Sequence, residues 1–282
     1  MKETFIAFFD ILGFKELVNR KPAEELKSVM EHLLRDTQSA LANGKYTHSP
    51  FGTIVPDLSK FGINCLHVSD SIIFWTNEAK VEDFNKIVDV CHAFYSTCIQ
   101  LGPLLRGCLT FGEIDFYPFK ISSCNEENQF INSSLYGKGL VEAYSKADSL
   151  EFVGCTIEQT AIDYIKTMIV EKPEGYDVNF VSNLIYDQKI CYYKIPSKNG
   201  SYYGHAFTPT IGTYNEVSFR NAAKEIESHF THRGEIELSP SVKTKLNNTL
   251  DFLSHFRLVV DNLREDIEKR MKEQEDGETK EE

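Results

Sequence analysis

Short apolar runs without helical spacing are the clearest pattern in this chain. They predict strands at residues 5–10, 63–68, 71–76, 104–114 and 151–153. The first run is apolar throughout until it ends at Asp10, which is typical of a fully buried strand. Only Ser69 and Asp70 separate the second and third runs, so these two strands are expected to form a hairpin.

Apolar residues recur at helical spacing elsewhere. This pattern predicts helices at residues 15–19, 22–41, 81–101, 138–146, 156–165, 215–230 and 242–272. Asn43-Gly44 and Gly102-Pro103 are helix-stop signals, and Ser239-Pro240-Ser241 is a helix start. Residues 44–60 and 122–134 are expected to be loops, and residues 168–212 are expected to be rich in strands, most clearly at 189–193.

The order of these elements predicts an α+β fold. It matches a ferredoxin-like, split βαβ sheet with helices packed on one face and a C-terminal helical extension. We expect a core domain at 1–170, a strand-rich segment with the C-terminal helices at 171–272, and a charged, disordered tail at 273–282. The last long helix carries an apolar stripe that either packs on its own sheet or builds a dimer. The stripe consists of Leu246, Leu250, Leu253, Phe256, Val259 and Leu263.

Composition narrows the classes of function. The 282 residues carry a formal net charge of −12, which argues against nucleic acids and anionic membranes as partners. The seven cysteines are scattered and form no CxxC pair, as expected for reduced core residues. The start of the chain lacks the features of a signal peptide, and no apolar run is long enough to span a membrane. We therefore expect a cytoplasmic protein.

Asp10 and Asp70 are the candidate functional residues, because each places a carboxylate within an apolar, strand-like segment. In a split βαβ sheet the first strand and the central hairpin are neighbours, so both carboxylates can reach one site. Together with the carbonyl of Ile11 they suit Mg²⁺ or Mn²⁺. The turn at Leu12, Gly13 and Phe14 leads into a helix whose first N–H groups could bind phosphate. The alternative for each aspartate is a simple turn or helix cap.

Four motifs, in order, resemble class III nucleotidyl cyclases. They are Phe9-Asp10-Ile11-Leu12-Gly13-Phe14, Ser69-Asp70-Ser71, the strand Leu105–Glu113 with Arg106-Gly107 and Gly112-Glu113, and the helix Tyr136–Tyr144. Their wording is most similar to the pyrimidine cyclases of bacterial Pycsar anti-phage systems, over about residues 4–165. The resemblance implies that Asp10, Asp70 and the Ile11 carbonyl hold two Mg²⁺ or Mn²⁺ ions. It also implies that Leu12, Gly13 and Phe14 bind the phosphates.

Three positions depart from the purine cyclases. Leu66 stands where those enzymes carry a base-reading Lys, and Val141 and Ser145 stand where their helix carries Asn and a transition-state Arg. Arg106 is the first candidate to replace that Arg, with an ion pair to a nearby carboxylate as its alternative. Lys138 and Lys146 follow as candidates, with simple solvent exposure as theirs.

The reaction that the resemblance implies is attack of a ribose 3′-OH on its own α-phosphate. UTP or CTP would give 3′,5′-cyclic UMP or cyclic CMP and pyrophosphate, in a homodimer, and a separate effector protein would respond to the product. Two other interpretations stay open: a purine cyclase with an unusual pocket, and an inactive cyclase fold that serves as a sensor. Tyr46 could stack on a base or pack in its loop, and His229 and His232 are expected to be surface residues.

Overall fold

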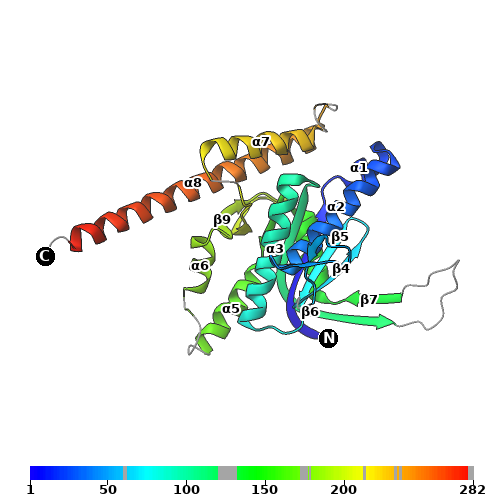
Figure 1. Cartoon of the computed structure of the whole chain (residues 1–282), viewed down its shortest axis with the longest axis horizontal. Coiled ribbons are helices and arrows are strands. Elements are labelled where there is room, and N and C mark those ends of the chain that lie inside the picture. Colours follow the sequence, from blue (N-terminus) through cyan, green and yellow to red (C-terminus); the bar gives the residue numbers. More distant parts are fainter. Residues whose placement is uncertain are drawn as a thin grey trace.

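The computed structural model describes residues 1–59, 62–119, 132–171, 177, 179–211, 214–231, 234 and 237–278. Figure 1 shows a central sheet with helices around it and a long C-terminal helix that projects from the body. The strands are β1 (Lys2–Ile11), β2 (Tyr46–His48), β3 (Ile54–Pro56), β4 (Ile63–Val68), β5 (Ser71–Thr76), β6 (Leu105–Phe119), β7 (Asn132–Tyr136), β8 (Gly154–Ile157), β9 (Ile190–Ile195) and β10 (Tyr202–Phe207). The helices are α1 (Phe14–Arg20), α2 (Ala23–Ala42), α3 (Val81–Leu101), α4 (Lys138–Ser149), α5 (Gln159–Glu171), α6 (Phe180–Tyr186), α7 (Glu216–Phe230) and α8 (Pro240–Glu278).

The strand order confirms the predicted split βαβ arrangement. The main sheet runs β4-β5-β1-β6-β8-β10-β9, and β7 pairs with β6 outside this path. β1 lies between β5 and β6 and is antiparallel to both, while α1 and α2 connect β1 to β4 and α3 connects β5 to β6. The first four core strands therefore alternate with their helices as a ferredoxin-like fold requires. β8 extends the sheet in parallel to β6, and the β9–β10 hairpin completes it.

Helices cover both faces of the sheet, so the expectation that they share one face is wrong. Phe5 and Phe9 of β1 belong to the apolar cluster that includes the α3 residues Phe84 and Phe94. The alternate β1 residues, among them Phe8, belong to a second cluster that α4 closes from the opposite side. The physical reason is visible in the β1 run itself, because a strand that is apolar at every position must bury both faces.

Several element boundaries differ from those expected. The expected loop at 44–60 contains the two-stranded β2–β3 hairpin. Residues 151–153 form no strand; β8 begins at Gly154 and α5 at Gln159. The expected strand-rich segment also holds the end of α5 and the helix α6. α8 continues to Glu278, beyond residue 272, and most of the expected loop at 122–134 lies outside the described residues.

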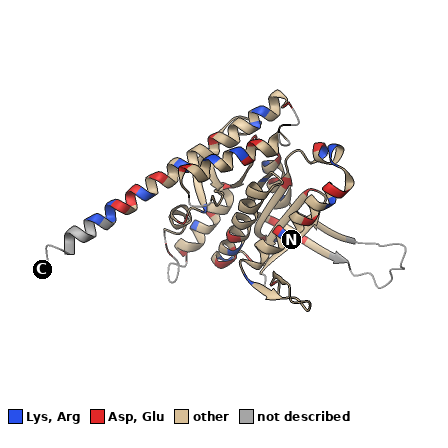
Figure 2. Ribbon diagram, turned by 45° about the horizontal axis from the view of Figure 1, so that its top comes forward, with Lys and Arg blue, Asp and Glu red and all other residues tan. Residues whose placement is uncertain are grey.

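The first half of α8 packs on its own chain. Phe256 and Val260 are fully buried, and α7 lies along this half of the helix (Figure 1). Leu246 and Leu253 join the main core, whereas Leu263, the last residue of the stripe, is only half-buried and belongs to none of the three apolar clusters. The projecting half beyond it is dense in alternating acidic and basic residues (Figure 2). The alternative of packing on the same chain therefore holds for the stripe from Leu246 to Val259.

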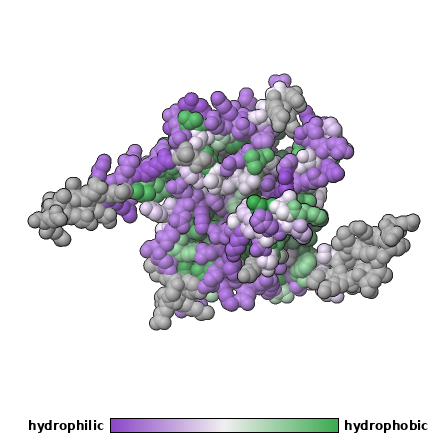
Figure 3. All heavy atoms as spheres, in the orientation of Figure 1, coloured by the Kyte–Doolittle hydropathy of each residue, from purple (hydrophilic) through white to green (hydrophobic). Residues whose placement is uncertain are grey.

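The cysteines and the surface agree with the composition. Six cysteines are free thiols, five of them buried and Cys65 half-buried, and Cys124 lies outside the described residues. Hydrophilic residues dominate the face seen in Figure 3, and hydrophobic ones show only in small separate areas. Among the helices in the described ranges, none is both long and apolar enough to cross a bilayer.

Candidate active site

Asp10 and Asp70 meet at one end of the sheet, as the sequence predicts. Asp10 is the penultimate residue of β1, where it lies opposite Ser71 of β5. Asp70 lies in the β4–β5 turn, and its carbonyl accepts a hydrogen bond of 3.2 Å from the backbone N–H of Ile11. The turn is thereby attached to the end of β1, which brings the two carboxyl groups together.

The pKa of Asp10 records the cost of this position. Burial raises it above its usual value, and the charge of Asp70 and a side-chain hydrogen bond with Asp70 raise it further. A hydrogen bond from Arg106 and its charge act in the opposite direction, but they do not cancel the rise. Two carboxyl groups that share a site repel each other when both are ionised, and a proton on one of them or a cation between them relieves that repulsion.

Arg106 is the structural partner of Asp10, as the ion-pair alternative anticipates. It faces Asp10 across β1 and β6, and its Nε and Nη2 donate to Oδ2 of Asp10 at 3.2 Å and 2.9 Å. On its other side, Nη1 donates to the carbonyl oxygen of Asp148 at 2.8 Å, and Nη2 lies 2.8 Å from Oδ1 of Asp148. The guanidinium is only 15% exposed, so these contacts are weakly screened by solvent.

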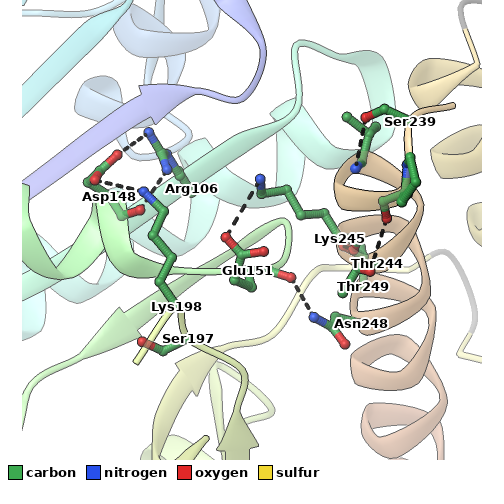
Figure 4. A network of polar contacts seen from close by, with 12 residues as sticks. Arg106, Asp148, Glu151, Ser197, Lys198, Ser239, Thr244, Lys245, Asn248 and Thr249 are labelled. Atoms are coloured by element: carbon green, nitrogen blue, oxygen red, sulfur yellow. Dashed lines mark hydrogen bonds and ion pairs between the residues drawn. The ribbon is translucent and has the colours of Figure 1, made fainter. Parts of the chain in front are cut away.

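Asp148 extends the cluster away from the sheet end. It lies near the C-terminus of α4, and its Oδ2 accepts a hydrogen bond of 2.9 Å from Nζ of Lys198 (Figure 4). The hydrogen bond from Lys198 is the largest effect on the pKa of Asp148 and lowers it. Burial acts in the opposite direction, and the charge of Arg106 adds to the lowering. Carboxylates and cations therefore alternate from Asp10 through Arg106 and Asp148 to Lys198, and Asp70 adds a second carboxylate beside Asp10.

A polar cleft of about 480 Å³ opens beyond Lys198. It lies between the β9–β10 turn, the segment after α4 and the start of α8, around the residues drawn in Figure 4. Its lining is Glu151, Pro196, Ser197, Lys198, Ser201, Thr244 and Asn248. Asn248 donates to the carbonyl of Glu151 at 2.8 Å, and Lys245 lies 3.6 Å from the Glu151 carboxylate, so α8 is attached to the chain just beyond Asp148.

The turn after β1 differs in one respect from its expected role. Leu12 cannot offer its N–H to a phosphate in this arrangement, because that group donates to the carbonyl of Leu104 at 2.9 Å. Gly13 precedes the first turn of α1 with φ of +78°, and no side chain caps that helix among the described residues. Of the three expected backbone donors, Gly13 and Phe14 remain candidates.

Ser69 occupies a backbone position whose conformation favours glycine. Ser69 directly precedes Asp70 in the β4–β5 turn and has a φ of +57°. Such a left-handed conformation suits Gly and is strained for Ser by about 1 kcal/mol. Ser69 therefore keeps the turn geometry that presents Asp70.

The carboxylate pair fits a hard divalent cation. Mg²⁺ is commonly bound through one or two carboxylates and completes its shell with water and substrate phosphate. Within the described residues, no three side chains of His, Cys, Asp or Glu converge as a closed metal site would require. Asp10 and Asp70 thus offer an open centre, which suits a cation that shares its ligands with a substrate.

Neither a protein-family model nor a curated protein sequence matches the chain. It is similar in structure to the catalytic core of a rhodopsin-guanylyl cyclase with converted specificity in complex with ATPαS (11% identity, TM-score 0.47, 74% of this chain and 96% of that one). It is also similar to a non-canonical dimeric guanylyl cyclase domain of the RhoGC fusion protein from the aquatic fungus Blastocladiella emersonii (9%, 0.49, 74% and 97%). The fold is therefore defined by the strand order and register of the chain itself.

The positions that depart from purine cyclases lie on or near α4. Leu66 is half-buried and packs against the apolar cluster beneath α4. Val141 is 64% exposed, and Ser145, one turn later, donates to the Val141 carbonyl at 2.7 Å. Lys146 is held by the buried Glu158 at 2.7 Å, whereas Lys138 is 89% exposed. Solvent exposure thus describes Lys138 but not Lys146.

Sequence reasoning missed Asp148 and Lys198. A lone guanidinium in a core strand requires a carboxylate partner, and that requirement was the available signal for Asp148. Lys198 lies in a turn whose distance from the site only the sheet order reveals. Tyr46 lies on β2 with 56% of its side chain exposed, and the half-buried His229 lies against Gly102. His232 lies outside the described residues.

Proposed function

We propose that this protein is a metal-dependent nucleotide cyclase whose substrate is a pyrimidine nucleoside triphosphate, UTP or CTP. The observation that carries the proposal is the meeting of Asp10 and Asp70 at the end of a split βαβ sheet. A like-charged pair that raises the pKa of a buried carboxyl group is more typical of an active site than of a purely structural position. The resemblance of the motifs to cyclases suggests the reaction for that pair, which is attack of a ribose 3′-OH on the α-phosphate of the same nucleotide.

Each residue of the site has a role in this reaction. Asp10 and Asp70 supply the carboxylate oxygens, and the Ile11 carbonyl is a further candidate ligand. When bound, Mg²⁺ or Mn²⁺ would lower the pKa of the ribose 3′-OH and neutralise charge on the phosphates. Arg106 fixes the position of Asp10, and the backbone at Gly13 and Phe14 can donate to phosphate oxygens.

Pyrimidine specificity rests on the resemblance and on Leu66. An apolar side chain packed in the α4 cluster replaces the Lys that reads a purine base in the resembling cyclases. The wording of the four motifs most resembles that of the pyrimidine cyclases of anti-phage systems. We accordingly propose a defence role, in which cyclic UMP or cyclic CMP activates a separate effector, and a homodimer as the active form.

An inactive cyclase fold that acts as a sensor is the second candidate. It is favoured by Val141 and Ser145, which offer no counterpart to the Asn and Arg of the resembling helix. It is also favoured by Arg106, whose donors are already engaged by Asp10 and Asp148. In this case the Asp10–Asp70 site would bind a nucleotide with a cation and release it unchanged.

One assay separates these functions. Purified protein is incubated with Mn²⁺ and each of ATP, GTP, CTP and UTP, and the products are resolved by mass spectrometry. Cyclic UMP or cyclic CMP supports the proposal; cyclic AMP or cyclic GMP refutes pyrimidine specificity; no cyclic product from folded protein refutes the enzyme. Asp70→Ala should abolish the product, whereas Asp187→Ala, an exposed aspartate after α6, should leave it unchanged.

A further inference from the structure

We infer that Arg106 takes the place of one of the two cations, so that the site holds a single divalent ion beside a fixed guanidinium. The inference rests on the proposed function only in taking Asp10 and Asp70 as the cation ligands. It departs from the two-ion centre that the motifs imply, because Arg106 occupies one of the carboxylate oxygens that such a centre would use.

The first step concerns the oxygens of Asp10. Both Nε and Nη2 of Arg106 donate to the same atom, Oδ2, at 3.2 Å and 2.9 Å. A Mg²⁺ bound to that atom at its usual distance of about 2.1 Å would lie within about 5 Å of the guanidinium nitrogen. Like charges at that separation in a half-buried site repel strongly. Oδ1 is therefore the Asp10 atom that a cation can share with Asp70.

The second step concerns the freedom of Arg106 to leave. Its far side is held by Asp148 through two contacts of 2.8 Å, one to the backbone carbonyl and one to the carboxylate. Both Arg106 and Asp10 are about 15% exposed, so solvent cannot readily replace these partners. A planar guanidinium with partners on both edges is a fixed charge, unlike a flexible lysine.

The third step concerns the count of ligands. A centre in which each of two ions binds one oxygen from each aspartate uses all four carboxylate oxygens, and the contacts of Arg106 with Oδ2 of Asp10 leave three. No third acidic, His or Cys side chain joins them in the part of the chain that the structure describes. One divalent ion and one guanidinium supply positive charge on both sides of Asp10. Arg106 is thus a positioning residue that also sets how strongly the site attracts a cation.

Mn²⁺ binding, followed by electron paramagnetic resonance and equilibrium titration, tests this inference without reference to activity. With a non-reactive UTP analogue present, the wild type should bind one Mn²⁺ per chain at the site. Arg106→Gln should bind Mn²⁺ about tenfold more tightly, equivalent to about 1.4 kcal/mol, and should admit a second ion. Arg106→Lys keeps the charge but not the two-sided contacts, so its Mn²⁺ affinity should lie between those of the wild type and Arg106→Gln.

Two variants guard against misinterpretation. Lys198→Met removes a cation from the far side of Asp148 and should change Mn²⁺ affinity by less than about threefold, since its charge is more distant. Asp148→Asn keeps the guanidinium but frees it from its second carboxylate, so Mn²⁺ should bind about threefold more weakly. This variant provides the test if Arg106→Gln does not fold.

The result that overturns the inference is two Mn²⁺ ions per wild-type chain, no Mn²⁺ at all, or an Arg106→Gln affinity equal to that of the wild type. A wild type that forms cyclic UMP while it binds two ions keeps the proposed function and rejects the inference. A wild type that binds one ion under the control of Arg106 but forms no cyclic product does the reverse.

Discussion

Arg106 and Asp10 face each other across β6 and β1, and the guanidinium holds a single carboxylate oxygen of Asp10 through two of its nitrogens. The pair connects the candidate site to the fold, because the same guanidinium holds the C-terminal end of α4 through Asp148. Asp70, by contrast, contributes its carboxylate from a turn. The two aspartates should therefore differ in what they contribute to stability.

Replacing Asp10 with Ala should destabilise the protein by about 1–3 kcal/mol. The substitution leaves a largely buried guanidinium without one of its two carboxylates, and an unsatisfied charged group costs that much. Asp10→Asn keeps an oxygen acceptor and should lose less. Urea unfolding in buffer with a chelator measures both. An Asp10→Ala variant as stable as the wild type would show that Asp148 alone satisfies Arg106.

Replacing Asp70 with Asn should stabilise the cation-free protein, by up to about 1 kcal/mol. Asp70 carries the same negative charge as Asp10, so removing it relieves the repulsion between the two carboxylates in the folded protein. The same change should abolish Mn²⁺ binding, as expected where a site trades stability for function. Urea unfolding and Mn²⁺ titration of one preparation give both results. A loss of stability would mean that Asp70 serves the turn and not the site.

Replacing Ser69 with Gly should stabilise the protein by about 0.5–1 kcal/mol. Ser69 has a φ of +57°, which Gly adopts without strain. Ser69→Ala is the matched control, because it removes the hydroxyl but keeps the unfavourable backbone, and it should gain nothing. Thermal unfolding of the three proteins decides between them. Equal gains in both variants would assign the effect to the hydroxyl group.

How far the sequence predicts this structure depends on whether a feature is local. The β4–β5 hairpin and the helix of residues 81–101 follow from periodicity within one segment, and both are found as expected. The meeting of Asp10 with Asp70 also follows, since it needs only the order of the core elements. The apolar β1 run predicts that both faces of the strand are covered. Local patterns could not show that α4 is the helix on the second face, because that depends on the crossover from β6 to the parallel strand β8.

The rest of the site depends on contacts between distant segments. Asp148 and Lys198 are separated by some fifty residues, and they meet because β10 pairs with β8 at the edge of the core. The N–H of Leu12 donates to the carbonyl of Leu104, a residue that follows α3 in the sequence. Neither relationship leaves a trace in residue spacing, so both become visible only in three dimensions.

Replacing Gly139 with Ala should destabilise the protein by about 1–3 kcal/mol, because α4 packs closely on the sheet at this point. A Cβ there would lie 2.6 Å from Cδ1 of Ile6 and 2.9 Å from the backbone of Gly112. The exposed Val141→Ala on the same helix should change stability by less than about 0.5 kcal/mol. Urea unfolding compares the two. Equal effects would show that α4 can shift to make room.

His92 should make the stability of the protein fall as the pH decreases from about 6.5 to 4. Burial and the charge of Lys189 lower its pKa to about 4, against smaller opposing effects of Asp89 and a hydrogen bond with the Thr208 backbone. The unfolded chain takes up a proton near pH 6.5 and the folded chain only near pH 4, so acid favours unfolding within this interval.

The expected loss from this one group between pH 7.5 and 4.5 is about 2–3 kcal/mol. His92→Gln cannot take up that proton, so its stability should fall by that much less than the wild type's over the same interval. His48→Gln, on the exposed β2 strand, should follow the wild type. Urea unfolding at the two pH values measures the three proteins. In the structure, Nε2 of His92 is buried and has no hydrogen-bond partner among the described residues. Parallel losses in the wild type and His92→Gln would contradict this burial and would mean that His92 titrates like an exposed histidine.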